Sequence, residues 1–336
     1  MNELEKAIAK LNKDWKSNVC TMGVEYEEVQ RIPFSSPRLN YATYGGVPVG
    51  RIVEFFGLNQ GGKTTTALDI VGQAQKMFPD KKVLFVDVER TFDSYWANLL
   101  GVDIDNLILL SPQDQYAEQV FEATLDLINT GEISVCVLDS LGAMVSKQEY
   151  EKSIEDFAMC GISKPLTRFS KEAIMSCART GTTLIGINQV RDNMNSMYGG
   201  VVTTGGKAWS HNCSMRVEFK KSDFVDEKGN TVSQQAENPA GNLVKFVIHK
   251  NKTARLDRKV GFYTLNYLEG IAYFNDTIDL AIKQDIIHQG GAWYSIVDEN
   301  GEVLNKWQGK TAVIAYYKEN EAEYRDLQKK VEESLK

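Results

Sequence analysis

The sequence has no run of apolar residues near the roughly 20 that a membrane-spanning helix requires. Its first six positions already carry Glu3, Glu5 and Lys6, and no long apolar run follows them. A secretory signal peptide is therefore not indicated. These absences predict a cytoplasmic protein with no membrane partner.

Cysteine is also scarce, with five residues among 336. The number is odd, the spacing is wide, and no C-x-x-C pair occurs. A disulfide framework and a structural zinc site are therefore not indicated. We expect free thiols in a reducing compartment.

The chain lacks an excess of basic residues, because 45 acidic residues outnumber 38 lysines and arginines and give a net charge of −7. A basic surface over the whole chain is therefore excluded, and contacts with DNA or RNA would have to come from local loops. With 43% hydrophobic residues, the composition is that of a globular protein of one large domain or two to three smaller ones.

Five short apolar runs of β type are separated by helical or turn-rich segments, at residues 52–56, 83–86, 107–110, 135–138 and 183–187. Helices are predicted over residues 63–77, where Pro79 follows, and 116–129. Apolar strands alternating with helices predict an α/β fold with a mostly parallel central sheet, covered on both faces.

After Ser214 the pattern changes to three strands of an antiparallel extension, at residues 215–219, 243–248 and 260–265. Residues 221–242 are polar and predict a long hairpin or loop. From about Ala272 short helices and a turn at Gly290-Gly291 predict a small C-terminal α/β domain, with a terminal helix over 321–336.

The N-terminal segment carries one apolar stripe at helical spacing, Leu4, Ile8, Leu11 and Trp15. The stripe predicts a helix that packs either on its own core or on a neighbouring subunit. We therefore expect an N-terminal oligomerisation segment over 1–33, an ATPase core over 34–271 and the C-terminal domain over 272–336.

The strongest motif is a complete P-loop, which reads Gly57-Leu58-Asn59-Gln60-Gly61-Gly62-Lys63-Thr64. An expected strand precedes it and an expected helix follows it, as phosphate binding requires. Lys63 is expected to reach the β- and γ-phosphates and Thr64 to ligate Mg²⁺. The motif predicts an ATPase with ATP and Mg²⁺ as cofactors.

Two further strands end in carboxylates. Asp139 follows the strand over 135–138 and is predicted to hold Mg²⁺ together with Thr64. Asp87 and Glu89 follow the strand over 83–86, and either could orient the attacking water. Spacing alone does not separate these two candidates.

Several segments together resemble the RecA family of recombinases over nearly the whole chain. They are Gly62-Lys63-Thr64-Thr65, Phe85-Val86-Asp87-Val88-Glu89, Gly101-Val102-Asp103-Ile104-Asp105-Asn106-Leu107, Val137-Leu138-Asp139-Ser140, Ile187-Asn188-Gln189-Val190-Arg191, Thr203-Thr204-Gly205-Gly206, Lys250-Asn251-Lys252 and Gly291-Ala292-Trp293-Tyr294-Ser295. The resemblance implies a RecA-type P-loop NTPase core.

The resemblance also implies roles for single residues. Glu89 becomes the catalytic base and Gln189 the γ-phosphate sensor. Asp93, Trp96 and Tyr267 are expected beside adenine, where the larger ring of Trp96 replaces the family's usual tyrosine. Lys250 and Lys252 resemble lysines that reach a neighbouring subunit's γ-phosphate, whereas position alone would also allow a solvated strand end.

DNA contacts are implied in two loops, near residues 149–162 and 190–205. The candidates in them are Met159, Arg191, Asn193, Met194, Asn195, Met197, Tyr198, Gly205 and Gly206. Such a mixture suits backbone hydrogen bonds and apolar wedges between bases. Ser210 and His211 stand where the family usually has a lysine and an aromatic residue at the subunit interface.

The resemblance thus implies an ATP-dependent DNA recombinase that forms a helical homo-oligomeric filament on single-stranded DNA and exchanges strands with double-stranded DNA. DNA-dependent ATP hydrolysis, DNA repair and the SOS response belong to that expectation. Two alternatives remain open: a related ring-forming motor of the helicase type, and a single-stranded DNA coating protein that uses ATP only as a clamp.

Overall fold

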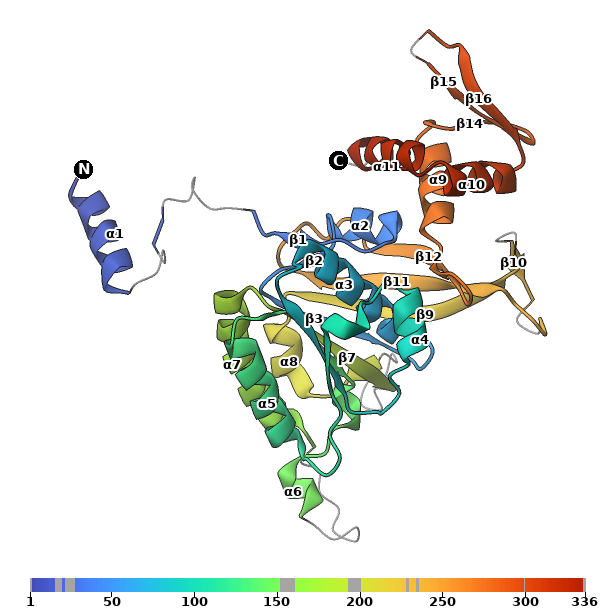
Figure 1. The fold of residues 1–336 in the computed structure, drawn as a ribbon. Coiled ribbons are helices and arrows are strands. Elements are labelled where there is room, and N and C mark those ends of the chain that lie inside the picture. Colours follow the sequence, from blue (N-terminus) through green and yellow to red (C-terminus); the bar gives the residue numbers. More distant parts are fainter. Residues whose placement is uncertain are drawn as a thin grey trace. The chain divides into compact units, whose positions relative to one another are not determined.

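The computed structural model describes residues 2–15, 20–21, 28–151, 161–192, 201–227, 230–233, 236–298 and 300–334, and only the backbone of residues 191, 192 and 201. The chain divides into two compact units, Met1–Gln30 and Arg31–Lys336. Figure 1 shows the elements of both units.

The N-terminal unit contains one helix, α1 (Glu3–Asp14), within its described residues. A capping box begins it, because Asn2 Oδ1 accepts from the amide of Glu5 at 2.8 Å and the Glu5 carboxylate accepts from the amide of Asn2 at 2.9 Å. No described side chain of α1 is buried, and Trp15, the last residue of the apolar stripe, is 67% exposed. Whether this stripe packs on its own core or docks on a neighbouring subunit remains a prediction.

The second unit is built on one large sheet with the strand order β13-β12-β11-β9-β3-β7-β6-β4-β5. The parallel part consists of β3 (Ile52–Gly57), β4 (Lys82–Asp87), β5 (Leu107–Leu110), β6 (Ile133–Asp139), β7 (Thr183–Asp192) and β9 (Met215–Val225). The antiparallel extension adds β11 (Gly241–Asn251), β12 (Val260–Asn266) and β13 (Gly270–Ile271). The predicted mostly parallel sheet with an antiparallel extension is confirmed. The strand expected at 215–219 differs in one respect, because β9 pairs parallel with β3 and antiparallel with β11 and so joins the two parts.

Shorter strands complete the sheets: β1 (Arg31–Ile32) pairs with β2 (Val47–Pro48), β8 (Val201–Thr203) with β7, and β10 (Thr231–Val232) with β9. The region 221–242, expected to be a polar hairpin or loop, is partly strand. β9 runs on to Val225 and β11 begins at Gly241. Polar residues hid these strand ends because the hairpin lies at the surface, where few apolar side chains are needed.

Helices cover both faces of the parallel sheet (Figure 1). They are α2 (Pro37–Thr43), α3 (Lys63–Met77), α4 (Ser94–Leu99), α5 (Ala117–Asn129), α7 (Ser163–Thr180) and α8 (Gly206–Asn212). The short helix α6 (Lys147–Tyr150) lies beyond the ends of α5 and α7 (Figure 1), and η2 (Ile104–Asn106) and η3 (Leu141–Ala143) are short 3-10 turns. Each strand sends alternate side chains to opposite faces. Val53 and Phe55 of β3 join one buried cluster, whereas Ile52 joins the other.

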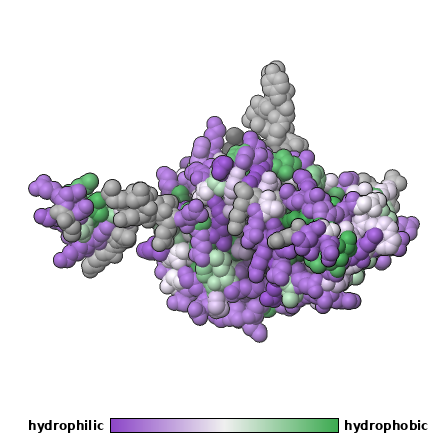
Figure 2. All heavy atoms as spheres, turned by 90° about the horizontal axis from the view of Figure 1, so that it is seen from above, coloured by the Kyte–Doolittle hydropathy of each residue, from purple (hydrophilic) through white to green (hydrophobic). Residues whose placement is uncertain are grey.

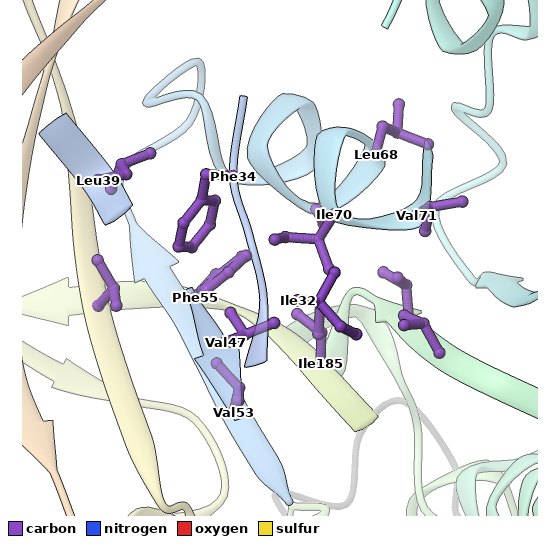
Figure 3. Close-up of a cluster of buried hydrophobic side chains, with 14 of the residues drawn as sticks. Ile32, Phe34, Leu39, Val47, Val53, Phe55, Leu68, Ile70, Val71 and Ile185 are labelled. Carbon is purple, nitrogen blue, oxygen red and sulfur yellow. The ribbon is translucent and has the colours of Figure 1, made fainter. Parts of the chain in front are cut away.

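The first of these clusters fills the space between α3 and the sheet. Figure 3 shows Ile70 of α3 near Phe55 and Val53 of β3, with Phe34 and Ile32 of the preceding segment beside them. All five are at most 3% exposed. This packing fixes α3, and therefore its N-terminal end, relative to the end of β3.

The C-terminal part has its own buried cluster, formed by α9 (Tyr273–Lys283), α10 (Lys310–Glu319), α11 (Glu321–Ser334) and a three-stranded sheet. That sheet consists of β14 (His288–Gly290), β15 (Trp293–Val297) and β16 (Val303–Gln308) and agrees with the predicted α/β character, although the sequence located none of its strands. The predicted turn at Gly290-Gly291 connects its first two strands. Its apolar residues are partly exposed, as Leu304 is at 62%, so no clear buried-strand pattern marks it.

Hydrophilic side chains cover most of the face in Figure 2, and hydrophobic ones form small separate groups. Exposed apolar residues such as Tyr95, Met175 and Leu268 are of the scattered kind common on globular proteins. Across the described ranges, no helix combines the length and apolarity that crossing a membrane requires.

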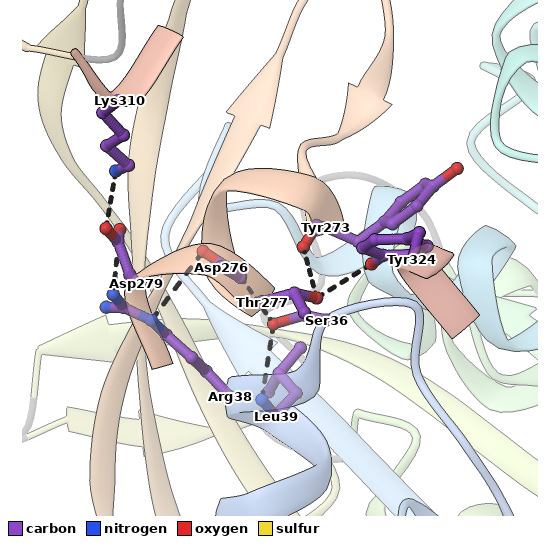
Figure 4. Close-up of polar contacts among 9 residues, drawn as sticks. All are labelled: Ser36, Arg38, Leu39, Tyr273, Asp276, Thr277, Asp279, Lys310 and Tyr324. Atoms are coloured by element: carbon purple, nitrogen blue, oxygen red, sulfur yellow. Dashed lines mark hydrogen bonds and ion pairs between the residues drawn. The ribbon is translucent and has the colours of Figure 1, made fainter. Parts of the chain in front are cut away.

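A charge network around the buried carboxylate of Asp276 connects α2 with α9 and α10 (Figure 4). The hydroxyl of Ser36 donates to Asp276 at 2.8 Å, and Arg38 lies 3.8 Å from the same carboxylate. Asp279 accepts from Arg38 at 3.2 Å and pairs with Lys310 at 2.6 Å. Asp276 is 2% exposed, and burial raises its pKa to about 7 despite the opposing effect of Arg38.

Replacing Asp276 by asparagine should flatten the pH dependence of stability. The folded-state pKa of about 7 lies well above the ordinary aspartate value of 3.8, so the folded chain binds this proton more tightly. The associated stability is fully present below about pH 4 and is lost as pH rises through about 7, with an upper limit of roughly 4 kcal/mol. Chemical denaturation of both proteins from pH 4.5 to 8 measures the difference.

The exposed carboxylate of Asp80 provides the control, because Asp80→Asn should leave the slope unchanged. An Asp276→Asn variant whose unfolding free energy keeps the wild-type pH slope would contradict this assignment.

Candidate functional site

The segment between β3 and α3 passes close to β9. Gly57 ends β3 with a φ of 148°, and a Cβ atom there would lie 2.1 Å from the carbonyl oxygen of Phe219. Gly62 caps α3 with a φ of 92°, and an added Cβ would lie 2.9 Å from the hydroxyl of Tyr263. Both positions require glycine because backbone angle and space exclude a side chain. The backbone amides of the loop are therefore continuous with those at the N-terminus of α3, and such a group of amides can bind phosphate.

Lys63 is the first residue of α3 and lies over this loop. Its ammonium group donates to the carbonyl oxygen of Leu58 at 2.7 Å, and the residue is 8% exposed. Burial lowers the pKa of Lys63, while the nearby carboxylates of Asp139 and Glu89 oppose that shift. The lysine charge is thus held among the residues predicted to bind the phosphates and the metal ion.

Thr64 and Asp139 meet at the ends of α3 and β6, where the hydroxyl donates to the carboxylate at 2.7 Å. Burial raises the pKa of Asp139 to about 6, and the hydrogen bond from Thr64 acts in the opposite direction. Mg²⁺ is commonly held by one or two protein oxygens together with phosphate and water. No group of three or more His, Cys, Asp and Glu side chains among the described residues is arranged for a metal. The Thr64 hydroxyl and the Asp139 carboxylate supply two neighbouring oxygens, which fit Mg²⁺ that arrives with a nucleotide.

The two carboxylates after β4 have different surroundings. Asp87 is 4% exposed and accepts hydrogen bonds from the amides of Thr91 and Phe92 at 3.1 and 3.0 Å. Its oxygens therefore stabilise the turn that follows the strand. Glu89 instead accepts from the hydroxyl of Ser140 and from the amide group of Gln189, the latter at 3.1 Å. This geometry favours Glu89 over Asp87 as the group that could act on water.

A pocket of about 310 Å³ opens beside the loop. Its lining consists of Gln60, Gly61, Gly62, Lys63, Thr64, Thr65, Trp96, Lys221, Asn242, Leu265 and Tyr267. The indole N–H of Trp96 donates to the Thr65 hydroxyl at 3.4 Å, and Tyr267 donates to Asn242 at 2.9 Å. Trp96 and Tyr267, both predicted near adenine, thus line one pocket with the P-loop.

Asp93 does not line this pocket, although it lies at the start of α4. Its carboxylate caps that helix by accepting from the amide of Trp96 at 3.1 Å. The contact fixes the start of the helix that carries the indole. The predicted place of Asp93 beside adenine remains a prediction.

Sequence reasoning missed four residues at this site. Lys221, Asn242 and Leu265 come from the antiparallel extension, and Ser140 follows Asp139 and contacts Glu89. Ser140 could have been found from the sequence, because it directly follows Asp139 at the carboxyl end of β6. The other three could not, because only the pairing of β9, β11 and β12 brings them beside the P-loop.

Gln189 connects the site to the predicted second DNA loop. In β7 it is aligned with Gly57 of β3, and the next residue, Val190, pairs with Thr203 of β8. β7 and β8 thus form a two-stranded stem at the base of the segment 190–205. The contact between Gln189 and Glu89 lies directly at the root of that stem.

Lys250 and Lys252 lie at the end of β11 and contact α8. Lys250 donates to the carbonyl oxygens of Ser210 and His211 at 2.6 and 2.9 Å, and Lys252 donates to that of His211 at 2.8 Å. Both ammonium groups therefore cap the C-terminal end of this helix. Burial lowers the pKa of Lys250, and the neighbouring charge of Lys252 adds to the effect. Neither lysine lines the pocket of its own chain.

Most predicted DNA contacts lie outside the described residues, namely Met159, Asn193, Met194, Asn195, Met197 and Tyr198, and Arg191 is described only in its backbone. Gly205 and Gly206 are described at the start of α8, with φ values of 98° and 74°. At both positions the backbone lies in the left-handed region that favours glycine.

Two protein-family models match the chain. The model of the RecA N-terminal domain matches residues 2–272, and the model of the RecA C-terminal domain matches residues 275–336. Between residues 2 and 336 the two matches leave out only residues 273 and 274, the first two of α9. Together with the P-loop and the sheet that carries it, they identify the chain as a member of the RecA family.

Proposed function

We propose that this RecA-family protein is an ATP-dependent DNA recombinase that forms filaments on single-stranded DNA and exchanges strands with homologous double-stranded DNA. The family matches over residues 2–272 and 275–336 support this proposal. The observation that carries it is the 3.1 Å contact between Gln189 and Glu89. This contact joins the proposed hydrolytic carboxylate to the strand that leads into the second loop.

The proposed division of labour follows the geometry of the pocket. Lys63 and the amides of the P-loop hold the phosphates, Thr64 and Asp139 hold Mg²⁺, and Glu89 orients a water molecule and accepts its proton. Bound ATP with Mg²⁺ supplies a γ-phosphoryl group whose charge the metal partly neutralises. Trp96 offers a ring on which adenine could stack.

Lys250 and Lys252 complete the site from a neighbouring subunit in this proposal. Their ammonium groups lie outside their own pocket and carry positive charge at the edge of β11. Cations supplied in trans stabilise the charge that develops during phosphoryl transfer. The N-terminal stripe of α1, a helix with no buried side chain, would bind the neighbouring subunit and build the filament.

The loops near 149–162 and 190–205 are proposed to bind DNA, which explains how an acidic chain could do so. Both follow carboxyl ends of parallel strands, at the edge of the sheet that also carries the P-loop. Gln189 would then change its contact with Glu89 as the loop engages DNA, so that DNA stimulates hydrolysis.

Single-stranded DNA should raise ATP hydrolysis by the wild-type protein, and Glu89→Gln should reduce turnover by about 10² to 10⁴-fold while leaving DNA binding intact. A coupled ATPase assay with and without a poly(dT) strand measures both effects, and electron micrographs record the assembly. Absence of stimulation down to low ionic strength would contradict the recombinase proposal. Rings in place of helical filaments would favour the helicase-type motor, and DNA binding by a wild type without turnover would favour the clamp.

Lys63→Ala should reduce hydrolysis by at least about 10²-fold, because it removes the buried cation nearest the proposed phosphates. Binding of a fluorescent ATP analogue and steady-state turnover measure the loss. Lys81→Ala is a matched control, since Lys81 also donates to one carbonyl oxygen, that of Thr180 at 2.8 Å, away from the pocket. Normal turnover by Lys63→Ala would refute the assigned phosphate site.

Lys250→Ala should reduce hydrolysis by about 10³-fold in the assembled state, because the neighbouring nucleotide loses a cation supplied in trans. Mixing this variant with Glu89→Gln should restore part of the activity, since each Glu89→Gln subunit still offers Lys250 to its neighbour. Lys245→Ala, on the same strand, serves as the control and should hydrolyse normally. Mixed filaments without any recovery would argue against a shared site.

A further inference from the structure

Glu54 is a fully buried carboxylate in the middle of the central strand β3. Its exposed fraction is 0%, and its backbone is paired with Gly186 of β7 on one side and Arg216 of β9 on the other. The residues before and after it on β3, Val53 and Phe55, belong to the hydrophobic core. A charged group at such a position is uncommon and needs partners.

Two side chains provide those partners, one from each neighbouring strand. The amide group of Asn188 donates to Glu54 at 2.9 Å, and the guanidinium group of Arg216 pairs with the other carboxylate oxygen. Arg216 also lies over the ring of Phe56, with its guanidinium carbon 4.7 Å from the ring centre. The carboxylate thus joins β7 to β9 across β3.

Both partners also hold the stem of the second loop, at two consecutive residues. The same amide group of Asn188 donates to the carbonyl oxygen of Thr204 at 2.8 Å. Arg216 donates to the hydroxyl of Thr203 at 3.3 Å. Glu54 therefore anchors the returning strand of the stem through two separate routes.

The same network adjoins the nucleotide site. Asn188 immediately precedes Gln189, whose amide group contacts Glu89, and Thr203 pairs with Val190. Beyond Thr204, the chain enters α8, whose far end accepts hydrogen bonds from Lys250 and Lys252. A movement of the Glu54 carboxylate would therefore affect Gln189, the stem of the second loop and α8, which the proposed trans lysines contact.

Stability alone does not account for a charge at this position. Replacing a buried ion pair with well-packed apolar residues is often neutral or stabilising, whereas removing one partner is costly. A buried polar network can instead hold neighbouring elements in one arrangement. β7 and β9 are already joined to β3 by backbone pairing, so the elements that gain from the network are the stem residues Thr203 and Thr204.

We propose that Glu54 is a positioning residue that holds the stem of the second loop in a fixed arrangement relative to Gln189, and thereby couples DNA binding to ATP hydrolysis. The inference rests on the proposed DNA-stimulated ATPase. Glu54 itself does not line the nucleotide pocket, so its effect acts through Asn188 and Arg216.

Glu54→Gln tests the proposal, because the amide can still accept from Asn188 but no longer carries the charge that pairs with Arg216. We expect basal hydrolysis and affinity for a fluorescent ATP analogue to stay within about twofold of wild type, while stimulation by poly(dT) falls about tenfold, within the usual range of coupling between sites. Asp276→Asn, a change at an equally buried carboxylate away from the stem, should keep full stimulation.

A double variant, Glu54→Gln with Arg216→Gln, separates positioning from folding. It leaves no unpaired charge and allows two amides to bond, so the melting temperature should recover from any loss in Glu54→Gln. Glutamine is too short to reach Thr203, so stimulation should remain low. Recovery of stimulation together with stability would overturn the proposal, because Glu54 would then be purely structural.

Amide hydrogen exchange, measured without DNA in peptides that cover residues 201–204, provides a second test of the proposal. A slowly hydrolysed ATP analogue with Mg²⁺ should change exchange there in wild type but not in Glu54→Gln. If wild type lacks DNA stimulation, the proposed function fails, and this exchange difference still decides whether Glu54 connects the nucleotide site to the stem. An equal response in both proteins, or equal DNA stimulation of both, would overturn the proposal.

Discussion

The parallel pairing of β3 with β7 determines how the P-loop and Gln189 lie relative to each other. Their register aligns Gly57 with Gln189, so the phosphate loop and the proposed sensor leave the sheet at the same edge. The pairing of β4 with β6 likewise aligns Asp87 with Asp139. A slip by one residue would turn alternate side chains to the opposite face. The apolar clusters on both faces of the sheet prevent such a slip, and the geometry of the site therefore depends on the packing of the core.

Much of the fold could be predicted from the sequence because buried parallel strands have a simple pattern. The apolar runs near Ile52, Val83, Leu107, Val135 and Thr183 all became strands of the predicted sheet. The C-terminal sheet could not be found in this way. Its strands are short and partly exposed, so their hydrophobic pattern is weak.

The candidate site was predictable only where a local pattern marks a single residue or motif. The P-loop met this condition through its motif, and Asp139 met it through its place at the end of an apolar strand, although it lies 75 residues from Thr64. Asp87 and Glu89 did not, because both follow one strand, and only their different partners, the turn amides and Gln189, distinguish them. Lys221 and Asn242 reach the pocket through long-range strand pairing, which no local pattern reveals. The motifs therefore locate the phosphates, whereas tertiary structure defines the rest of the pocket.

The contacts of Lys250 and Lys252 with the end of α8 have a consequence for assembly. A lone subunit already satisfies these donors internally, so joining a neighbour exchanges one set of acceptors for another. Under the proposed trans arrangement, the lysines contribute to the free energy of association only by the difference between two interactions. One is with the oxygens of the neighbour's nucleotide, and the other is with the two helix carbonyls that the lysines leave. If the neighbouring subunit holds no nucleotide, moving the lysines away from α8 would stabilise the interface little. Bound nucleotide would therefore strengthen the association between subunits.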